Sequence, residues 1–398
     1  MTANAADPIV IASAARTPMG GFQGELAPLT APQLGSAAIR AALERAGVAG
    51  EDVSEVIMGC VLPAGMGQAP ARQASFDAGI PQAVGCTTIN KMCGSGMKAA
   101  MFGHDLIAAG SADIVVAGGL ESMSNAPYLL DKARGGYRLG NGRIYDHMFI
   151  DGLEDAYEKG KLMGAYAEDT AEHYQFTREA QDDFAIASLK RAQAATADGS
   201  FSGEITPVTV KTRKGEAVID TDEQPRNANL DKIPTLKPAF REGGTVTPAN
   251  SSSISDGAAA LVMMRMSEAE KRGVAPLAIV RGHATHAQAP AWFTTAPIDA
   301  IRKVLARVDW DKDAVGLWEV NEAFAVVTMA AMRDLDIPHD KMNVHGGACA
   351  LGHPVGASGA RIMATLMAAM RKYDVDRGVA SLCIGGGEAT AIALERVH

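Results

Sequence analysis

The stretch NKMCGSGMKAA (residues 90–100) sets Cys93 between an apolar run and a helical one. Residues 86–91 are expected to form a strand, and residues 95–109 a helix that stops before a glycine. Residues 113–117 are a second apolar strand, which we expect to end at the glycine pair that follows it. This strand–helix–strand order is the building unit of sheets that are covered by helices.

The same alternation extends to both ends of the chain. It predicts strands over residues 9–14, 55–61, 257–264, 276–286 and 378–384, and helices over residues 31–46, 298–308, 322–335 and 356–370. We therefore expect an α/β protein in which a mostly parallel sheet carries helices on both faces.

The two ends of the chain resemble each other. In the first copy, CGSG from Cys93 leads into a helix rich in Ala and Met, then into DIVVAGG and Glu121. In the second copy, GASG from Gly356 leads into a similar helix, then into VASLCIGGG and Glu388. This weak repeat indicates an internal duplication. Two copies of one unit would bury a shared core and place paired loops at their junction, where such folds bind ligands.

The segment between the copies is richer in charge, Gly, Asn and Tyr. We expect helices over residues 164–174 and 178–197, the second one capped by Thr177. The chain is therefore divided into an N-terminal α/β half (1–120), an inserted loop domain with ligand contacts (121–250), a return to the first half (251–275) and a C-terminal α/β half (276–398).

Basic residues gather in one part of this insertion. They are Lys211, Arg213, Lys214, Arg226, Lys232 and Lys237. A solvated basic loop is the commoner explanation for such a run. The functional alternative is a patch that binds a phosphorylated ligand.

Composition narrows the class of protein. The chain has 398 residues, of which 47% are hydrophobic and 21% charged, and this excludes a disordered chain. A net charge of −9 argues against a nucleic-acid surface, and no run approaches the roughly 18 apolar residues of a membrane helix. The first residues carry no secretory or transit signal. Five scattered cysteines are too few for a disulfide scaffold, so we expect free thiols in a cytoplasmic protein without nucleic-acid or membrane partners.

Two residues at the starts of the repeated helices could form a reactive pair. Cys93 precedes a helix, whose free N–H groups and dipole would lower the thiol pKa and make a nucleophile. A buried, inert thiol is the alternative for any single cysteine. His353 lies between Gly352 and Pro354, so it cannot sit inside a helix. It could serve as a base for a thiol, or it could be a structural loop histidine.

Cys383 and Asn321 are candidates at the ends of later strands. Cys383 precedes three glycines, whose unobstructed N–H groups can stabilise an oxyanion. A strand cysteine is otherwise most often part of a core. Asn321 stands at a strand-to-helix junction, where it could cap the helix or orient water or substrate with its amide.

A metal site is the competing interpretation for the same region. His345, Cys349 and His353 follow one another at four-residue spacing, which on one helix would form a metal-binding face. Gly352 and Pro354 make a continuous helix improbable, so no metal is expected. Neither a dinucleotide-binding nor a P-loop glycine motif opens a helix after a strand.

Taken together, several blocks of sequence resemble the thiolase family, and within it the acetyl-CoA acetyltransferases. The blocks are NKMCGSGMKA around Cys93, GGLESMSNAPY from Gly118, GTVTPANSSSISDGAAA from Gly244, NEAFA from Asn321, NVHGGACALGHPVGASGAR from Asn343 and CIGGG from Cys383. They run in order over almost the whole chain, and GHPxGxSG together with CxGGG is highly specific. The resemblance implies a duplicated, five-layered α/β/α/β/α fold with a loop domain inserted in the N-terminal half.

The resemblance also implies roles for individual residues. Cys93 would be the nucleophile that becomes acylated, and His353 the base that activates it. Cys383 would be the acid/base that takes a proton from the second acyl-CoA. Asn321 would hold a water that forms one oxyanion hole with His353, and the N–H groups of Cys93 and Gly385 would form the other.

The implied reaction is the reversible Claisen condensation of two acetyl-CoA molecules to acetoacetyl-CoA and CoA, by a ping-pong route through an acyl-cysteine. The implied contacts with coenzyme A are Met163, Arg226 and Leu236, with Ser252 beside the pantetheine and Phe324 as a pocket wall. Coenzyme A thioesters would be the substrates, without a permanently bound cofactor. Family members are usually homotetramers or homodimers, and a tetramer contact would lie in residues 128–149.

Chain-length preference stays open, because Leu162 stands where many short-chain biosynthetic thiolases have a histidine. A broader 3-ketoacyl-CoA thiolase of fatty-acid degradation is therefore the alternative. The related decarboxylating ketoacyl synthases use one cysteine and two histidines, which does not fit Cys383. A catalytically silent binding protein of this type would have lost Cys93, His353 or Cys383, and none of them is missing.

Overall fold

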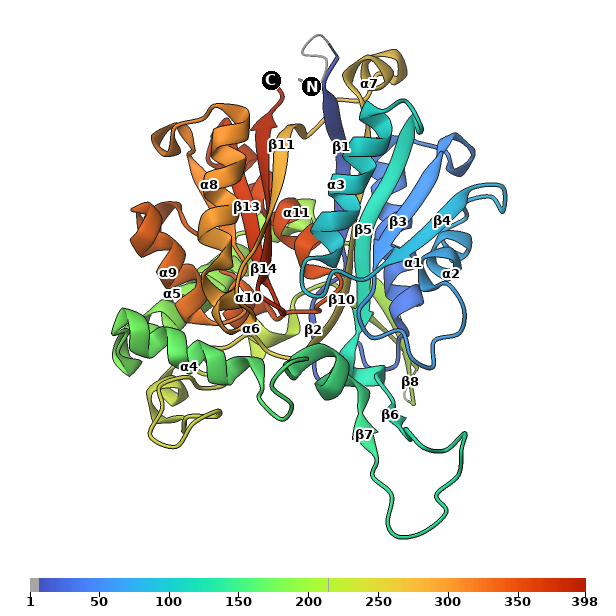
Figure 1. Cartoon of the computed structure of the whole chain (residues 1–398). Coiled ribbons are helices and arrows are strands. Elements are labelled where there is room, and N and C mark those ends of the chain that lie inside the picture. Colours follow the sequence, from blue (N-terminus) through green and yellow to red (C-terminus); the bar gives the residue numbers. More distant parts are fainter. Residues whose placement is uncertain (1–6, 214) are drawn as a thin grey trace.

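The structure is a computed structural model that describes residues 7–213 and 215–398, so Lys214 of the basic stretch lies outside the described residues (Figure 1). Among these residues, ten strands form one continuous sheet in the order β12-β13-β14-β11-β1-β10-β5-β3-β4, with β2 beside β10. The N-terminal half supplies β1 (Ile9–Arg16), β2 (Gly20–Gly21), β3 (Glu55–Gly59), β4 (Gly85–Ile89), β5 (Ile114–Ser122) and β10 (Ser255–Arg265). The C-terminal half supplies β11 (Ala278–Ala287), β12 (Leu317–Val320), β13 (Arg377–Ile384) and β14 (Glu388–Arg396).

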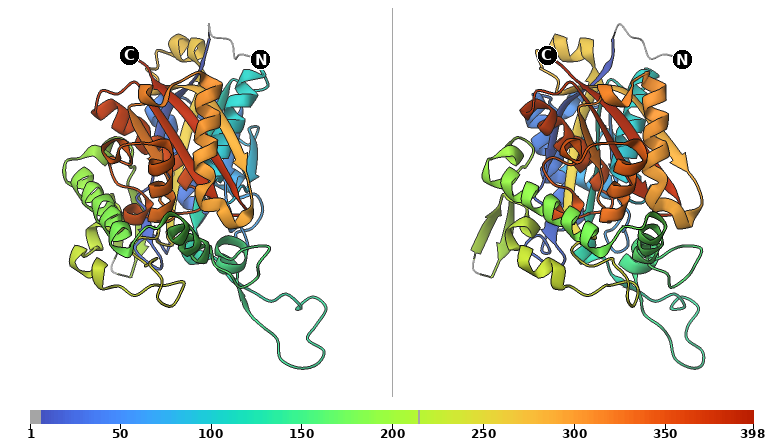
Figure 2. Two further views of the ribbon diagram at one scale, coloured as in Figure 1. Left: turned by 60° about the vertical axis from the view of Figure 1, so that its left-hand side comes forward. Right: turned by 90° about the vertical axis from the view of Figure 1, so that its left-hand side faces the viewer.

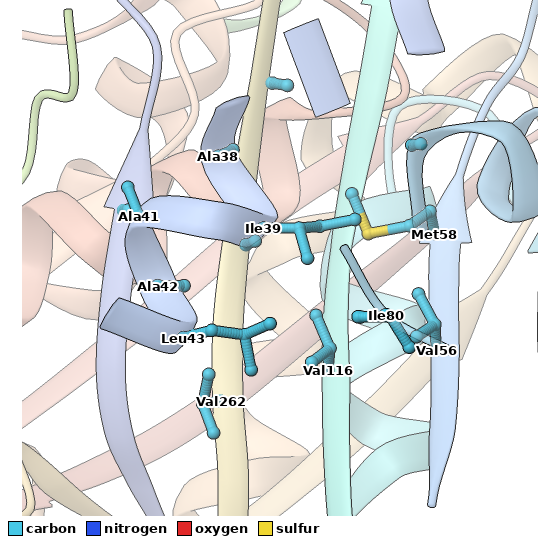
Figure 3. Packing of buried hydrophobic residues seen from close by; sticks show 14 of the residues in the cluster. Ala38, Ile39, Ala41, Ala42, Leu43, Val56, Met58, Ile80, Val116 and Val262 are labelled. Atoms are coloured by element: carbon cyan, nitrogen blue, oxygen red, sulfur yellow. The ribbon is translucent and has the colours of Figure 1, made fainter. Parts of the chain in front are cut away.

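Helices divide the molecule into five layers. The layer helices are α1 (Ala31–Ala46), α2 (Pro70–Asp77), α3 (Ser95–Ala108), α8 (Ala296–Val308), α9 (Ala325–Leu335) and α11 (Ser358–Lys372). Helices α1 and α2 cover the outer face of the first half-sheet, where Ile39 and Leu43 pack against Val56, Val116 and Val262 (Figure 3). Helices α8 and α9 cover the outer face of the second half-sheet. Helices α3 and α11 lie between the two half-sheets and share one apolar core with both. The expected duplicated, five-layered architecture is thus confirmed.

The duplication is also visible in the strand pairing. In the first half β3 and β5 are parallel and β5 and β10 antiparallel, and in the second half β12 and β13 are parallel and β13 and β14 antiparallel. Even the irregularities match, because β1 shifts register between Ile11 and Ser13, and β11 between Val280 and Gly282. Each shift leaves one extra residue in the first strand of its half.

The expectation of a mostly parallel sheet was wrong. Parallel pairing is confined to β3 with β4 and β5, and to β12 with β13. The central strands β14, β11, β1, β10 and β5 pair antiparallel. The reason is that the last strand of each half returns without a covering helix. Strand β14 follows β13 after a three-glycine turn, and β10 returns after the insertion.

Some expected boundaries shift. Strand β5 does not end at residue 117 but continues through Gly118 and Gly119 to Ser122. These glycines have a packing reason, because a Cβ on Gly119 would lie 1.9 Å from the carbonyl oxygen of Gly356. Helix α9 begins at Ala325 and not at residue 322. The non-helical backbone of residues 321–324, which bends at Ala323, is therefore available to a site.

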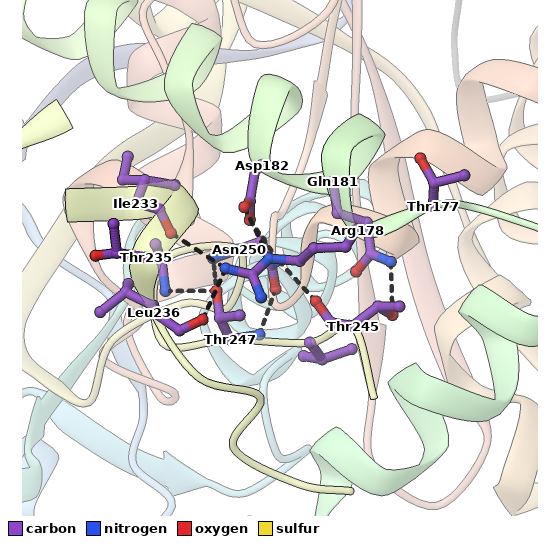
Figure 4. Close-up of polar contacts among 12 residues, drawn as sticks. Thr177, Arg178, Gln181, Asp182, Ile233, Thr235, Leu236, Thr245, Thr247 and Asn250 are labelled. Atoms are coloured by element: carbon purple, nitrogen blue, oxygen red, sulfur yellow. Dashed lines mark hydrogen bonds and ion pairs between the residues drawn. The ribbon is translucent and has the colours of Figure 1, made fainter. Parts of the chain in front are cut away.

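The insertion contains helices α4 (Met163–Tyr174), α5 (Arg178–Ala197) and α6 (Glu223–Asn227), and the hairpin β8 (Val208–Thr212) and β9 (Gly215–Ile219). As expected, the Thr177 side chain caps α5 by accepting a hydrogen bond from the backbone of Ala180. Figure 4 shows how α5 fastens the rest of the insertion. Arg178 pairs with Asp182 and donates to the Leu236 carbonyl, and Asp182 accepts from the Asn250 amide. These hydrogen bonds thus connect α5 to Leu236, before residue 240, and to Asn250, after it.

A long arm leaves the body between β6 (Tyr128–Leu129) and β7 (Tyr145–Asp146), as Figures 1 and 2 show. It carries large apolar side chains in solvent: Leu139 is 97% exposed and Ile144 67%. No helix among the described residues is long and apolar enough to cross a membrane.

A buried ion pair network ties the insertion to β1. The Arg16 guanidinium is fully buried and contacts Glu204 through Nε at 2.6 Å and Asp222 through Nη1 at 2.7 Å and Nη2 at 2.9 Å. These carboxylates raise the pKa of Arg16 although burial acts the other way. Asp222 also accepts from the backbone of Met19. The charged groups compensate one another, so losing one leaves a buried charge unpaired.

We expect the Asp222→Ala variant to lose about 3–5 kcal/mol of unfolding free energy, because the Arg16 charge would stay buried with only Glu204 beside it. Urea denaturation of the purified protein measures this. Asp198→Ala is the matched control, since Asp198 pairs with Lys372 at the surface, where a pair contributes about 0–1 kcal/mol. Equal losses in the two variants would contradict the assignment.

Candidate active site

Cys93 lies in a tight turn between β4 and α3. The turn is closed by Ser95, whose hydroxyl accepts from the Lys91 backbone at 2.9 Å and donates to the Met92 carbonyl at 2.6 Å. Met92 has a φ of +47°, a left-handed conformation that is uncommon for a residue with a side chain. The turn thus places the cysteine between Met92, whose backbone is strained, and the helix that begins at Ser95, and such strain is frequent at functional sites.

The environment of the Cys93 sulfur differs from the expectation. Burial raises the pKa of the Cys93 thiol to about 11, and the Glu121 carboxylate acts in the same direction. The backbone N–H groups of Gly385 and of Cys93 itself oppose this rise but do not cancel it. The prediction that the helix start lowers this pKa was therefore wrong, because desolvation outweighs the backbone N–H groups at the sulfur. The thiol needs a base to become a nucleophile.

Cys383 lies opposite Cys93, at the end of β13. It is completely buried, and burial, with the Cys93 sulfur second, raises the pKa of the Cys383 thiol well above its ordinary value. The following turn has Gly386 at φ +91° and Gly387 at +89°, which only glycine adopts without strain. This turn presents the Gly385 N–H to Cys93. The structure thus brings together two cysteines that are 290 residues apart in the sequence.

His353 is held in one orientation by Ser358. Its Nδ1 lies 2.5 Å from the Ser358 hydroxyl, and that hydroxyl donates to the Pro354 carbonyl at 3.0 Å. Because the hydroxyl proton is directed to Pro354, Nδ1 carries the proton in the hydrogen bond to Ser358, and Nε2 is left with its lone pair. Nε2 is buried without a partner among the described residues. Burial, assisted by the Arg361 charge, lowers the pKa of His353 to about 3, so the ring is neutral.

Asn321 ends β12 and does not cap α9, which begins four residues later. Its backbone donates to Ser381, and its side-chain Oδ1 accepts from Arg361 at 3.5 Å. That contact leaves Nδ2 as the free end of the amide, buried without a partner in the described chain. Arg361 therefore acts on both residues: it contacts the Asn321 amide, and its charge lowers the pKa of His353. Two unpaired polar nitrogens, one from each residue, are the donors or acceptors that a bound substrate or water would need.

The segment before β10 connects these loops. Ser252 is half-buried and donates its backbone N–H to Ala323, while the carbonyl of Ser253 accepts from the His353 backbone at 3.1 Å. Phe324 is buried and packs edge-on against Phe240, with ring centroids 5.9 Å apart. Ser252 and Phe324 therefore lie beside the loops of His353 and Asn321.

Met163 reaches the same site from the insertion. A Cβ built on Gly385 would lie 3.5 Å from the Met163 sulfur, so this side chain contacts the glycine turn. Met163 and Phe324 also share an apolar cluster with Cys383. They therefore pack around the second cysteine.

Arg226 and Leu236 have contacts farther out. Arg226, on α6, is half-exposed and its guanidinium contacts Glu25 at 2.6 Å. Leu236 is half-buried and fastened through its carbonyl to Arg178. Among the described residues their contacts tie them to the insertion and its edge, and not to Cys93 or His353. The basic residues of the stretch do not share one element either, since Lys211 belongs to β8 and Lys232 to the turn after α6.

The three residues of the metal alternative point to different partners. His345 packs against Phe201 and Tyr373, and Cys349 contacts the carbonyl of Glu322, while His353 binds Ser358. Among the described residues, another group has ligand atoms within 4.8 Å of one another: His104, Asp105 and His283. In that group both histidines already bind the same Asp105 oxygen, at 3.1 and 2.9 Å.

Three charged residues near the site were not singled out as site residues from the sequence. Glu121 was noted only as the end of a repeat, yet it accepts backbone hydrogen bonds from two loops. Arg361 is fully buried in α11, although its sequence context is that of an ordinary helix. Lys91 pairs with Glu388 and so links the loop before Cys93 to the strand after the glycine turn. A charged residue within an apolar or glycine-rich run was the available signal in each case.

Comparison with known proteins gives a consistent result. The family descriptions "Thiolase, N-terminal domain" and "Thiolase, C-terminal domain" match residues 9–267 and 274–396. An acetyl-CoA acetyltransferase of Cupriavidus necator is 50% identical over 390 residues, which are 98% of this chain and 99% of the relative. One of Rhizobium meliloti is 49% identical over 390 residues, with the same coverage. The crystal structure of the Bacillus anthracis acetyl-CoA acetyltransferase is 39% identical and matches with a TM-score of 0.95 over 98% of this chain and 99% of that one. The chain is therefore a member of the thiolase family.

Proposed function

We propose that the protein is an acetyl-CoA C-acetyltransferase, which condenses two acetyl-CoA molecules reversibly to acetoacetyl-CoA and CoA. The observation that carries this proposal is the pair of facing thiols, Cys93 and Cys383, with the Gly385 N–H at the Cys93 sulfur. Acyl transfer between thioesters needs one thiol as acyl carrier, and C–C bond formation needs a second group as base at the α-carbon. Relatives that are 46–50% identical over nearly their full length bear the name acetyl-CoA acetyltransferase, which supports the same reaction.

In the first half-reaction, Nε2 of His353 takes the proton of the Cys93 thiol. The thiolate attacks the carbonyl carbon of acetyl-CoA, and the N–H groups of Cys93 and Gly385 bind the oxyanion that forms. When the tetrahedral adduct collapses, the C–S bond to CoA breaks and the CoA sulfur takes the proton of the Cys383 thiol, which leaves Cys383 as a thiolate and the Cys93 proton on Nε2 of His353. The product is a new thioester on Cys93, so the step is close to thermoneutral and reversible.

In the second half-reaction, Cys383 as thiolate removes a proton from the α-carbon of a second acetyl-CoA. The enolate oxygen lies at Nε2 of His353 and at a water held by Nδ2 of Asn321. Nε2 is the donor in this contact because it still carries the proton that it took from Cys93. The enolate carbon attacks the acetyl group on Cys93, and the Cys93 sulfur leaves and takes back its proton from Nε2 of His353, while Cys383 keeps the proton taken from the α-carbon.

We also propose that the coenzyme A contacts come from the insertion, residues 121–250, together with two residues of the loops beside it. Met163 beside Gly385, and Ser252 and Phe324 beside the His353 loop, would surround the pantetheine arm and the acyl group. Arg226 and Leu236, farther out, would meet the nucleotide end. Coenzyme A thioesters would be substrates, and the chemistry above uses no permanently bound cofactor.

The arm between β6 and β7 supports an oligomer. Its exposed Tyr128, Leu139 and Ile144 would be buried if arms of several copies packed together, and we propose a homotetramer built in this way. Because the mechanism needs both Cys93 and Cys383 as thiols, we further propose that the enzyme works in the reducing cytoplasm.

The role of Cys93 is tested by the Cys93→Ala variant. We expect thiolysis of acetoacetyl-CoA to fall by on the order of 10⁴-fold or more, since no acyl carrier would remain. The fold should survive, because Cys93 lies in a turn outside the helices and strands and is partly exposed as a residue. Cys86→Ala, a half-buried thiol on β4, is the matched control and should retain activity. Undiminished thiolysis in Cys93→Ala, or labelled acetyl on another residue, would refute the mechanism.

The role of Cys383 is tested by separating the half-reactions. In the Cys383→Ser variant, labelled acetyl-CoA should still acetylate Cys93, but condensation should fall by about 10²–10⁴-fold, because a hydroxyl is a poor base at the α-carbon. Rapid quenching followed by mass spectrometry of the acetylated peptide measures the first step. Equal loss of both half-reactions would contradict separate roles for the two thiols.

Chain-length preference follows from the walls around Cys383. Because Met163, Phe324 and Phe240 close this space, we expect the highest kcat/KM for the four-carbon 3-ketoacyl-CoA, with roughly a tenfold loss or more for each added two-carbon unit. Thiolysis rates over chains of four to twelve carbons measure this, and Met163→Ala should reduce the loss for six carbons. Equal rates at eight carbons and beyond would favour a broader 3-ketoacyl-CoA thiolase of fatty-acid degradation.

A further inference from the structure

We propose that Glu121 is a positioning residue, whose carboxylate holds the loop of His353 in register with the part of the chain that surrounds Cys93. This inference rests on the proposed function, because it assigns a task within that reaction. Glu121 lies on β5, is completely buried and does not touch the reacting atoms named above.

Glu121 accepts hydrogen bonds from two loops at once. Its Oε2 lies 2.8 Å from the Val61 nitrogen and 2.9 Å from the Gly356 nitrogen. Its Oε1 lies 3.1 Å from the Leu62 nitrogen and 3.7 Å from the Cys60 sulfur. Three backbone N–H groups and a thiol thus converge on one carboxylate, and they come from segments almost 300 residues apart.

Both loops belong to the site. Val61 and Leu62 pack in one apolar cluster with Cys93 and Val355. Gly356 lies three residues after His353, at the start of the helix that carries Ser358. The contact leaves no spare room, since a Cβ on Gly356 would lie 2.6 Å from the Glu121 carboxylate. The carboxylate therefore connects the wall behind the nucleophile to the loop of its base.

The negative charge of Glu121 does not promote the reaction. A negative charge raises the pKa of the Cys93 thiol and so opposes formation of the nucleophile. The carboxylate is itself disfavoured here, since burial raises the pKa of Glu121 to about 7 in spite of the three N–H donors. The negative charge of Glu121 is therefore unfavourable, but both of its oxygens accept hydrogen bonds from the two loops. Glu121 contributes by holding these loops in position.

An amide of the same shape cannot replace it. In Glu121→Gln one oxygen becomes an NH₂ group, which would face either the Leu62 N–H or the pair of N–H groups from Val61 and Gly356. At least one donor then meets another donor, and one loop must shift. Glu121→Asp retains the charge but is one methylene shorter, so it cannot reach both loops.

The experiment compares both variants with the wild type in acetoacetyl-CoA thiolysis and in alkylation of Cys93 by iodoacetamide. We expect kcat to fall about 10- to 100-fold in each variant, because small displacements of catalytic groups have effects of this size. KM should stay within about threefold, since the proposed coenzyme A contacts lie elsewhere. In Glu121→Gln, alkylation at pH 8 should be as fast as in the wild type or faster, because the opposing charge is gone.

Glu204→Gln is the matched control, a buried carboxylate that pairs with Arg16 outside the site. It should lower stability and leave kcat of the folded enzyme unchanged. If kcat of both Glu121 variants equals that of the wild type, or if kcat, KM and alkylation all deteriorate together as in a loosened fold, the inference is overturned. Where Glu121→Gln does not fold, Glu121→Asp decides by the same criteria. An inactive wild type would instead refute the proposed function.

Discussion

The structure depends on backbone contact between the two helices of the middle layer. A Cβ on Gly96 of α3 would lie 2.8 Å from the Ala360 nitrogen, and one on Gly359 of α11 would lie 2.3 Å from the Met97 nitrogen. Only residues without side chains allow this approach. Because each helix begins at a catalytic loop, close contact of the helices brings Cys93 and His353 to one place. The half-sheets, the outer helices and the insertion are arranged around this crossing.

Burial then determines the protonation states at this crossing. It raises the pKa of both thiols and lowers that of His353, so the resting site is neutral. Neutral groups can be enclosed without charged partners. Charge would arise only during the reaction, where N–H groups aimed at the developing oxyanion stabilise it most in a dry environment. The elevated thiol pKa is consistent with a nucleophile that is formed when needed.

Much of this organisation could be predicted from the sequence. The helices over residues 31–46 and 178–197 were expected with their observed ends, because periodicity and capping residues are local signals. The duplication was visible because the helix starts at Cys93 and Gly356 repeat. The antiparallel centre of the sheet was missed, since strand direction depends on pairing between distant segments. Glu121 and Arg361 were missed for the same reason. Their function depends on the backbone N–H groups and the amide that surround them in the fold, and the spacing of residues along the chain does not reveal these contacts.

The two half-sheets join through a very short seam. Strands β1 and β11 pair at Val10 with Ile279 and at Ile11 with Ala278, and the core of the middle layer is continuous across this seam. Opening the halves as a hinge would break these bonds and expose a shared apolar interior. The two halves therefore form one frame, and any adjustment to a bound molecule falls to the loops and the insertion at its edge.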